Sequence, residues 1–89
     1  MQTNFLLGAL KLTTEAHMAL KRQPYDLLAR HAVNDYGHVT EKEREANDLS
    51  MHTAGAIKSR YKVDPRDPRS RNVLIITAAD WSETVIKLE

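Results

Sequence analysis

The chain has 89 residues, a formal net charge of +1 and no cysteine. A chain of this length can bury one modest core but cannot also enclose a deep catalytic cavity. The missing cysteines exclude disulfides, thiolate nucleophiles and cysteine-ligated zinc, and the small net charge argues against a nucleic-acid binder that relies on bulk electrostatics. We therefore expect residues 1–89 to form a single cytoplasmic domain with neither signal peptide nor membrane span.

The first part of the chain predicts two short helices. Asn4 is a suitable N-cap for a helix over residues 4–11, because its side chain can accept a hydrogen bond from a free N–H of the first turn. Either Thr13 or Thr14 can cap a second helix. Its body is expected at Glu15–Arg22, where apolar residues recur at helical spacing.

A third helix is predicted over residues 24–34. Pro24 suits its first position, where the locked φ angle favours the helix and the missing N–H has no role. The apolar residues that follow fall on one stripe of the helix surface. Gly37 is a suitable left-handed stop after this helix.

Thr40-Glu41-Lys42-Glu43 predicts the start of a fourth helix. These residues form a capping box, in which the first and last side chains each bind the other's backbone N–H. The helix is expected to continue to about Thr53 and to end at Gly55. Its inner face is expected to include Leu49 and Ser50, because they share one side of the helix.

The pattern changes from helix to strand at residue 56. Apolar and basic residues alternate from Ala56 to Val63, which predicts a half-exposed strand. Two more strands are expected at Asn72–Thr77 and Ser82–Leu88, joined by a turn over Ala78–Trp81. We expect an α+β fold in which three to four helices of residues 1–55 pack on a three-stranded antiparallel β-meander of residues 56–88. The final Leu88-Glu89 pair resembles a cloning-site remnant, so no function is assigned to Glu89.

Short motifs along residues 24–88 occur in a recognisable order. They are Leu27–His31, Asp35–Gly37, Asn47, Ser59–Tyr61 and Ile76–Thr84. With these motifs the chain resembles a family of short proteins carried by bacterial plasmids, integrative elements and phages, whose members typically have Trp at the position of Tyr36. The resemblance implies a mobile-element setting, in which small proteins often inhibit host defence, anti-CRISPR proteins among them. It implies no reaction.

The polar residues do not form a pattern typical of an enzyme or a metal protein. His31 and Asp35 are four residues apart on a predicted helix, so Asp35 could orient the imidazole as a general base. No nucleophile motif or oxyanion site accompanies them, and we favour a local pairing at the helix end. The four histidines lack the spacing of zinc ligands. We therefore expect a protein that is not an enzyme, with no catalytic residue, no cofactor and no metal.

The segment Lys58–Arg71 has six basic and two acidic residues, a local net charge of +4. It is either a solubilising surface, a docking site for an acidic host protein, or a phosphate-binding surface for nucleic acid. Trp81 is either a core plug or an exposed anchor. Our leading hypothesis is stoichiometric binding of a host protein, with a nucleic-acid-binding module as the alternative and either a monomer or a homodimer as the acting species. The expected contact residues are Arg60, Lys62, Arg66, Arg69, Arg71 and Trp81.

Overall fold

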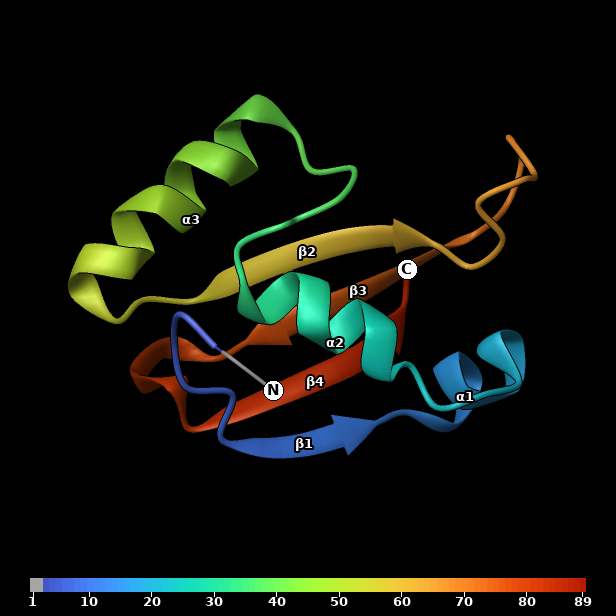
Figure 1. Cartoon of the computed structure of the whole chain (residues 1–89), viewed down its shortest axis with the longest axis horizontal. Helices are drawn as coiled ribbons and strands as arrows, with labels where there is room; N and C mark the ends of the chain where they lie inside the picture. The colour runs from blue at the N-terminus through green and yellow to red at the C-terminus, as the bar shows by residue number, and fades with distance from the viewer. Residues whose placement is uncertain (1–2) are drawn as a thin grey trace.

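A computed structural model describes residues 3–89, which form three α-helices and a four-stranded sheet (Figure 1). In chain order the elements are β1 (Ala9–Leu12), α1 (Thr14–Leu20), α2 (Tyr25–Ala32), α3 (Glu41–Thr53), β2 (Ile57–Lys62), β3 (Asn72–Thr77), the 3-10 turn η1 (Ala79–Trp81) and β4 (Glu83–Leu88). The strands lie in the order β1-β4-β3-β2. The α+β class is therefore confirmed, as are the three strands expected after residue 56.

The sheet differs from the expected three-stranded antiparallel meander because β1 joins it, parallel to β4. The helix expected over residues 4–11 is wrong. A helix this short is marginal without tertiary support, whereas β1 gains hydrogen bonds along the free edge of β4. Gly8 permits this close approach: its φ is +66°, and a Cβ at this position would lie 2.2 Å from the Ser82 carbonyl oxygen.

Side-chain caps define the starts of α1 and α3, whereas α2 starts after Pro24 without one. Thr13, rather than Thr14, caps α1 by accepting a hydrogen bond from the Ala16 N–H. The capping box of α3 is confirmed, and so is its extent to Thr53, but Ala54, with φ at +55°, takes the left-handed conformation that ends the helix in place of Gly55. Helix α2 stops at Ala32, earlier than expected, and Gly37 does not end it. Gly37 instead lies beside Arg60 of β2 in an isolated bridge.

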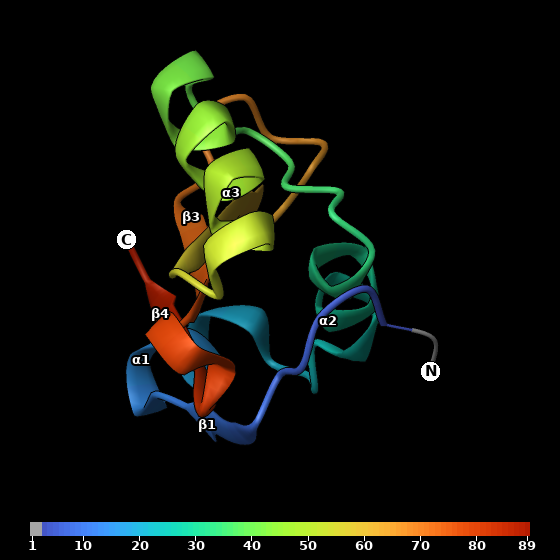
Figure 2. The same ribbon diagram turned by 90° about the vertical axis from the view of Figure 1, so that its left-hand side faces the viewer.

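The main core lies between one face of the sheet and α2. Alternate residues of β2, β3 and β4 point to this face, and they meet the inner side of α2. Figure 2 shows α2 on one side of the sheet and α3 near the β2 edge. A second cluster forms around Phe5, Tyr36 and Ile57, with Trp81 packed against it.

Helix α3 presents a polar side, not the expected apolar one, to the rest of the molecule. Leu49 is 64% exposed, so its assignment to the inner face is wrong, whereas that of Ser50 is confirmed, and Asn47 is buried beside it. The reason is that α3 packs on the edge of β2. The Asn47 amide donates to the Lys58 carbonyl oxygen at 2.8 Å and accepts from the Lys58 N–H at 2.9 Å. One side chain thus replaces a neighbouring strand.

The next outward-facing backbone groups of β2 are also paired. The Arg60 N–H donates to the Tyr36 carbonyl oxygen at 2.9 Å, and the Arg60 carbonyl oxygen accepts from the His38 N–H at 2.7 Å. Unpaired edge groups invite pairing with other chains. The β2 edge is therefore closed from Lys58 to Arg60.

Replacing Asn47 with alanine should lower the free energy of unfolding by about 2 kcal/mol, because both Lys58 backbone groups lose their partner in a buried setting. Urea denaturation measures the loss. Asp48→Ala, an exposed neighbour on the same helix, is the matched control and should change stability by less than about 0.5 kcal/mol. Equal effects of the two variants would contradict the edge-capping role of Asn47.

Candidate functional site

The basic segment divides into a paired part on β2 and a free part in the loop that follows. On β2, Lys58 Nζ lies 2.9 Å and Arg60 Nη1 2.7 Å from the two Glu43 carboxylate oxygens. Arg60 Nη2 lies 3.0 Å from a Glu89 carboxylate oxygen. Arg60 hydrogen-bonds Glu43 and, with help from the Thr40 N–H, holds the pKa of the Glu43 carboxyl far below its usual range. Arg60 is thus already neutralised within the molecule.

The loop after β2 consists of two successive Asp-Pro-Arg turns. Asp64 Oδ1 accepts from the Arg66 N–H at 3.0 Å, and Asp67 Oδ1 accepts from the Arg69 N–H at 2.9 Å. Each aspartate carbonyl oxygen also accepts from the N–H three residues later, on Asp67 and on Ser70. These are two Asx-turns, each with a proline that fixes φ at its second position. Asp-Pro steps favour turns, and both steps of this loop form one.

A serine closes this double turn at its base. Ser70 Oγ accepts from the Asp64 N–H at 2.9 Å and donates to the Arg71 carbonyl oxygen at 2.8 Å. The Val63 N–H donates to the same Arg71 oxygen at 2.9 Å. The loop is consequently held by its own hydrogen bonds, and its arginines start from a defined backbone.

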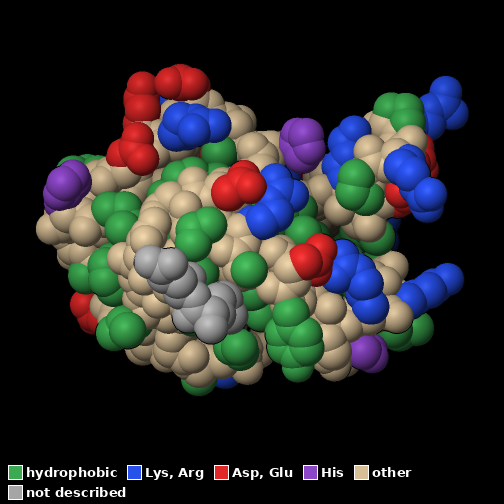
Figure 3. Space-filling model, viewed as in Figure 1, with side chains coloured by type: hydrophobic (Ala, Val, Ile, Leu, Met, Phe, Trp, Pro, Cys, Tyr) green, Lys and Arg blue, Asp and Glu red, His purple; other side chains and the backbone are tan. Residues whose placement is uncertain are grey.

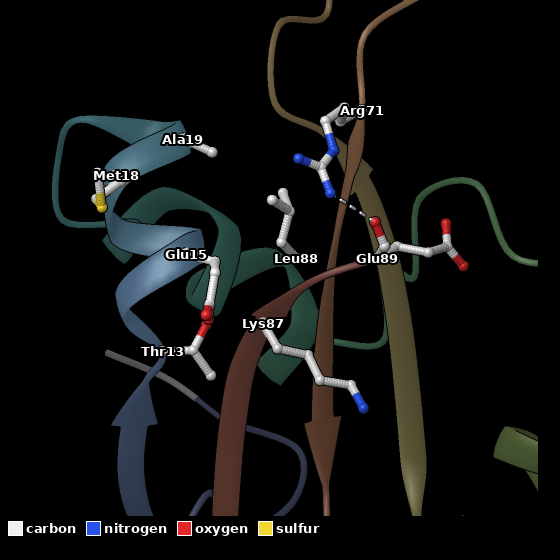
Figure 4. Close-up of a pocket in the computed structure, with 8 residues that line it drawn as sticks. All are labelled: Thr13, Glu15, Met18, Ala19, Arg71, Lys87, Leu88 and Glu89. Carbon is white, nitrogen blue, oxygen red and sulfur yellow. Dashed lines mark hydrogen bonds between the residues drawn. The ribbon is translucent and has the colours of Figure 1, made fainter.

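The loop arginines extend into solvent. The Arg66 side chain is 93% exposed, with Nε 3.6 Å from Asp64 Oδ1, and Arg69 is exposed as well. Arg71 donates from Nη2 to the Glu89 carbonyl oxygen at 3.4 Å, and with Leu88 it lines an open hollow of about 640 Å³ between α1 and the end of β4 (Figure 4). Arg66 and Arg69 are therefore the guanidinium groups best placed for a partner.

Basic residues of α2 and the segment before it continue this surface. Arg22, Arg30 and Lys62 line a groove of about 120 Å³ next to the loop. Arg22 pairs with Asp26, and the Arg30 guanidinium, paired with Asp35, lies 4.7 Å from the centre of the Tyr61 ring. Figure 3 shows the basic side chains gathered on the side of the molecule that bears the loop. Sequence reasoning missed Arg22 and Arg30, because only the fold brings them beside residues 62–69.

Trp81 lies at the other end of the sheet. It follows the β3 end that pairs with Ile57, whereas the loop follows Lys62 (Figure 1). Its Nε1 donates to the Gly55 carbonyl oxygen at 3.0 Å, and its ring centre lies 5.6 Å from that of Phe5. The half-buried indole thus packs against the second core cluster. It lies apart from the arginines that share the expected contact surface.

A chain of side-chain hydrogen bonds crosses the core at His31. Its Nδ1 lies 2.6 Å from Ser59 Oγ, and its Nε2 lies 2.9 Å from Thr77 Oγ1. Thr77 Oγ1 lies 2.7 Å from Thr84 Oγ1, which donates to the Leu7 carbonyl oxygen at 2.7 Å. All four side chains are fully buried.

The Leu7 carbonyl at the end of this row of hydrogen bonds sets the direction of each bond back to His31. The Leu7 carbonyl can only accept, so Thr84 uses its single proton there and must accept from Thr77. Thr77 in turn accepts from His31, which places an imidazole proton on Nε2. Because burial lowers the pKa of His31 to about 4, the imidazole is neutral at neutral pH, and its unprotonated Nδ1 accepts from Ser59.

The expected pairing of His31 with Asp35 is wrong. The Asp35 carboxylate binds Arg30, with Nε 2.7 Å from Oδ2. His31 instead shares the buried side of α2 with Leu27 and Leu28, and Phe5 packs edge-on against its ring. Burial lowers the pKa of His31 to about 4. An imidazole enclosed in this way organises the core and does not face a substrate.

Within residues 3–89, no three His, Asp or Glu side chains gather closely enough to hold a metal ion. None of the helices described is sufficiently long and apolar to span a bilayer. Comparisons with protein-family models, with curated proteins and with solved structures found no match to this chain.

Acidification between pH 6.5 and 4 should destabilise the protein through His31. The unfolded chain takes up a proton on this imidazole near pH 6.5, while the folded state resists protonation until about pH 4. The unfolded state binds more protons in this window, so the free energy of unfolding decreases as the pH is lowered, by roughly 3 kcal/mol in total. Urea denaturation across the pH range measures this.

Nitrogen-15 NMR of the folded protein checks the proton assignment directly. The Nε2–H tautomer of His31 should persist throughout this window. His17→Asn, at an exposed histidine of α1, should leave the stability profile unchanged, whereas His31→Gln should flatten it above pH 4.5. An Nδ1–H signal for His31 would refute the proposed direction of the hydrogen-bond chain.

Proposed function

We propose that this protein is a non-enzymatic binding protein that docks onto an acidic protein surface through Lys62, Arg66, Arg69 and Arg71. The observation that carries the proposal is the double Asp-Pro-Arg turn, which projects two exposed guanidinium groups from a loop fixed by its own hydrogen bonds. A planar guanidinium can bind a carboxylate through two parallel hydrogen bonds. The loop thus combines the right chemistry with a backbone that is already ordered.

Pre-ordering matters because binding must otherwise immobilise the contact loop. Ordering a flexible segment subtracts from the affinity that its contacts supply. In the loop, Pro65 and Pro68 restrict the backbone, and Asp64 and Asp67 occupy the adjacent N–H groups. The aspartates reduce the local charge, and although Asp64 lies 3.6 Å from Arg66 Nε, the Arg66 side chain stays 93% exposed.

The occupied aromatic residues favour a protein partner over nucleic acid. Single-stranded nucleic acids are usually held by aromatic rings that stack on bases. Tyr61, which lies within the basic segment, is 2% exposed and donates its hydroxyl to the Asp35 carbonyl oxygen. Trp81 packs at the far end of the sheet. With Lys58 and Arg60 neutralised by carboxylates, the remaining charge suits a local acidic patch better than a phosphate backbone.

The proposed biological setting rests on the resemblance to proteins of plasmids, integrative elements and phages. In that setting we propose a subunit of a host defence complex as the partner, inhibited stoichiometrically as by anti-CRISPR proteins. A cytoplasmic location belongs to the same proposal. The contact set is narrower than the sequence suggests, because Arg60 and Trp81 have partners within the molecule.

Reversing the charge of the two exposed arginines should weaken partner binding. Arg66→Glu with Arg69→Glu should weaken it by at least about tenfold in an affinity pull-down from host lysate followed by titration with the captured protein. The matched control is Lys42→Glu with Arg44→Glu on α3, the same change of charge on exposed residues. Unchanged binding by the arginine variant would exclude this surface.

The nucleic-acid alternative has a distinct signature in the same experiment. A gel shift by the unaltered protein that weakens steeply between low and physiological salt, and that the arginine variant loses, would replace the protein partner with a nucleic acid. No shift at low salt would exclude it.

Loosening the loop without changing its charge should also weaken binding. Pro65→Gly with Pro68→Gly leaves every arginine in place but enlarges the set of loop conformations. Each substitution should raise the free-energy cost of ordering the loop by about 0.4–1 kcal/mol. The affinity for the captured partner should fall roughly fourfold to thirtyfold, measured by calorimetry. If the loop variant bound as tightly as the unaltered protein, pre-ordering of the turns would have no part in recognition.

A further inference from the structure

The two edges of the sheet differ in whether their outward backbone groups have hydrogen-bond partners. The β2 edge is closed by Asn47, Tyr36 and His38, as described above. At the other edge, the Ala9 N–H donates to the Ser82 carbonyl oxygen and the Thr13 N–H to the Ile86 carbonyl oxygen, both at 3.0 Å. Odd-numbered residues of β1 thus face β4, and the backbone groups of Leu10 and Leu12 point outward.

No described element pairs with this outer edge. The strand β1 ends the order of the sheet, and Figure 1 shows it at the lower margin of the molecule with nothing beyond it. Leu10 is 50% exposed, and Tyr25 at the start of α2 is 66% exposed beside it. The two residues border a hollow of about 200 Å³ that reaches Leu28. An open edge with apolar neighbours is a site for strand addition.

We propose that β1 pairs with β1 of a second copy of the chain, antiparallel, across a two-fold axis at Leu10. Each Leu10 N–H then donates to the Leu10 carbonyl oxygen of the other copy, and the two four-stranded sheets become one continuous sheet. A two-fold axis makes the surface its own partner. The two half-exposed leucines also cover each other.

The charges on the opposite face of β1 select both the partner and the register. Lys11 Nζ lies 2.7 Å from a Glu83 carboxylate oxygen in the same chain. An axis at Lys11 would place two ammonium groups directly opposite each other, which is unfavourable. An axis at Leu10 places Lys11 opposite Ala9 of the second copy, whose small side chain leaves room toward that copy's Glu83. Each carboxylate then lies between two lysines.

Disulfide trapping tests the register, since the unaltered chain has no cysteine. Leu10→Cys places two thiols at the axis, where hydrogen-bonded antiparallel neighbours have Cα atoms about 5.5 Å apart, within reach of a disulfide. Mild oxidation should give a covalent dimer in high yield. Leu12→Cys, displaced from the axis, and Leu49→Cys, an exposed leucine on α3, should remain monomeric. Equal crosslinking of all three would overturn the proposal.

Sedimentation equilibrium tests the interface without crosslinking. Leu10→Pro removes an N–H that the monomer does not use, while the β1–β4 ladder keeps its Ala9 and Thr13 donors. The dimer dissociation constant should rise at least about tenfold, because two symmetry-related hydrogen bonds are lost.

A second pair of variants keeps the test independent of proline. Leu10→Lys should dissociate the dimer, whereas Leu49→Lys should not, and circular dichroism verifies that both variants fold. An unaltered chain that sediments as a monomer throughout, or variants at Leu10 that dimerise as tightly as the unaltered chain, would overturn the proposal. Neither result bears on the arginine loop, whose binding is measured separately.

Discussion

The hydrogen-bond chain through His31 is the interaction on which the rest of the molecule depends. It begins at Ser59 on β2, passes through α2, continues to Thr77 and Thr84 on β3 and β4, and ends at the Leu7 carbonyl before β1. Segments far apart in sequence are thereby fixed relative to one another. Buried polar groups stabilise a fold only when all are satisfied, and the described residues contain no buried side-chain polar atom without a partner.

A polar core of this kind explains how a small domain sets its layers. Apolar side chains alone would allow α2 to slide along the sheet, because hydrophobic contacts have little directionality. The imidazole has two nitrogens at fixed angles, and each needs a partner on a different strand. The position of α2 over β2 and β3 follows. The loop at the far end of β2 and the groove beside Lys62 are therefore built on a rigid base.

The arginines illustrate how position changes the role of one residue type. Arg60 joins α3 to the end of β4 by binding Glu43 and Glu89, and Arg30 lies over the Tyr61 ring. Arg66, by contrast, touches only Asp64, through its backbone N–H and a long contact from Nε, and its side chain is 93% exposed. Glu89, expected to have no function, contributes a structural contact in this network.

Local signals predicted much of the fold and less of the site. The capping box at Thr40 and the alternation from Ile57 to Tyr61 are features of neighbouring residues, and the structure follows them. The strand β1 could not be found in this way, since its four residues form a strand only because β4 offers an edge. For the same reason the sequence paired His31 with Asp35, its neighbour on the helix, while its partners lie 28 and 46 residues away.

The basic segment shows the same limit. A run of charges along the chain predicts a basic surface, but it does not reveal which charges meet a carboxylate once folded. Lys58 and Arg60 face Glu43, fifteen and seventeen residues earlier. Arg22 and Arg30 join the surface only through the packing of α2. Counting charges along the sequence therefore overestimated the free basic charge on β2. It also missed the basic residues of α2 and of the segment before it.

The self-contained hydrogen bonding of the double turn has a consequence for divergence. The hydrogen bonds that shape residues 64–70 have both their donors and their acceptors within Val63–Arg71. Substitutions at the tips of the two turns would leave the core and its polar chain untouched. The residues that we propose for recognition are thus separate from those that fold the domain, so this loop could change by mutation, or be moved to another scaffold, with little effect on the stability of the domain.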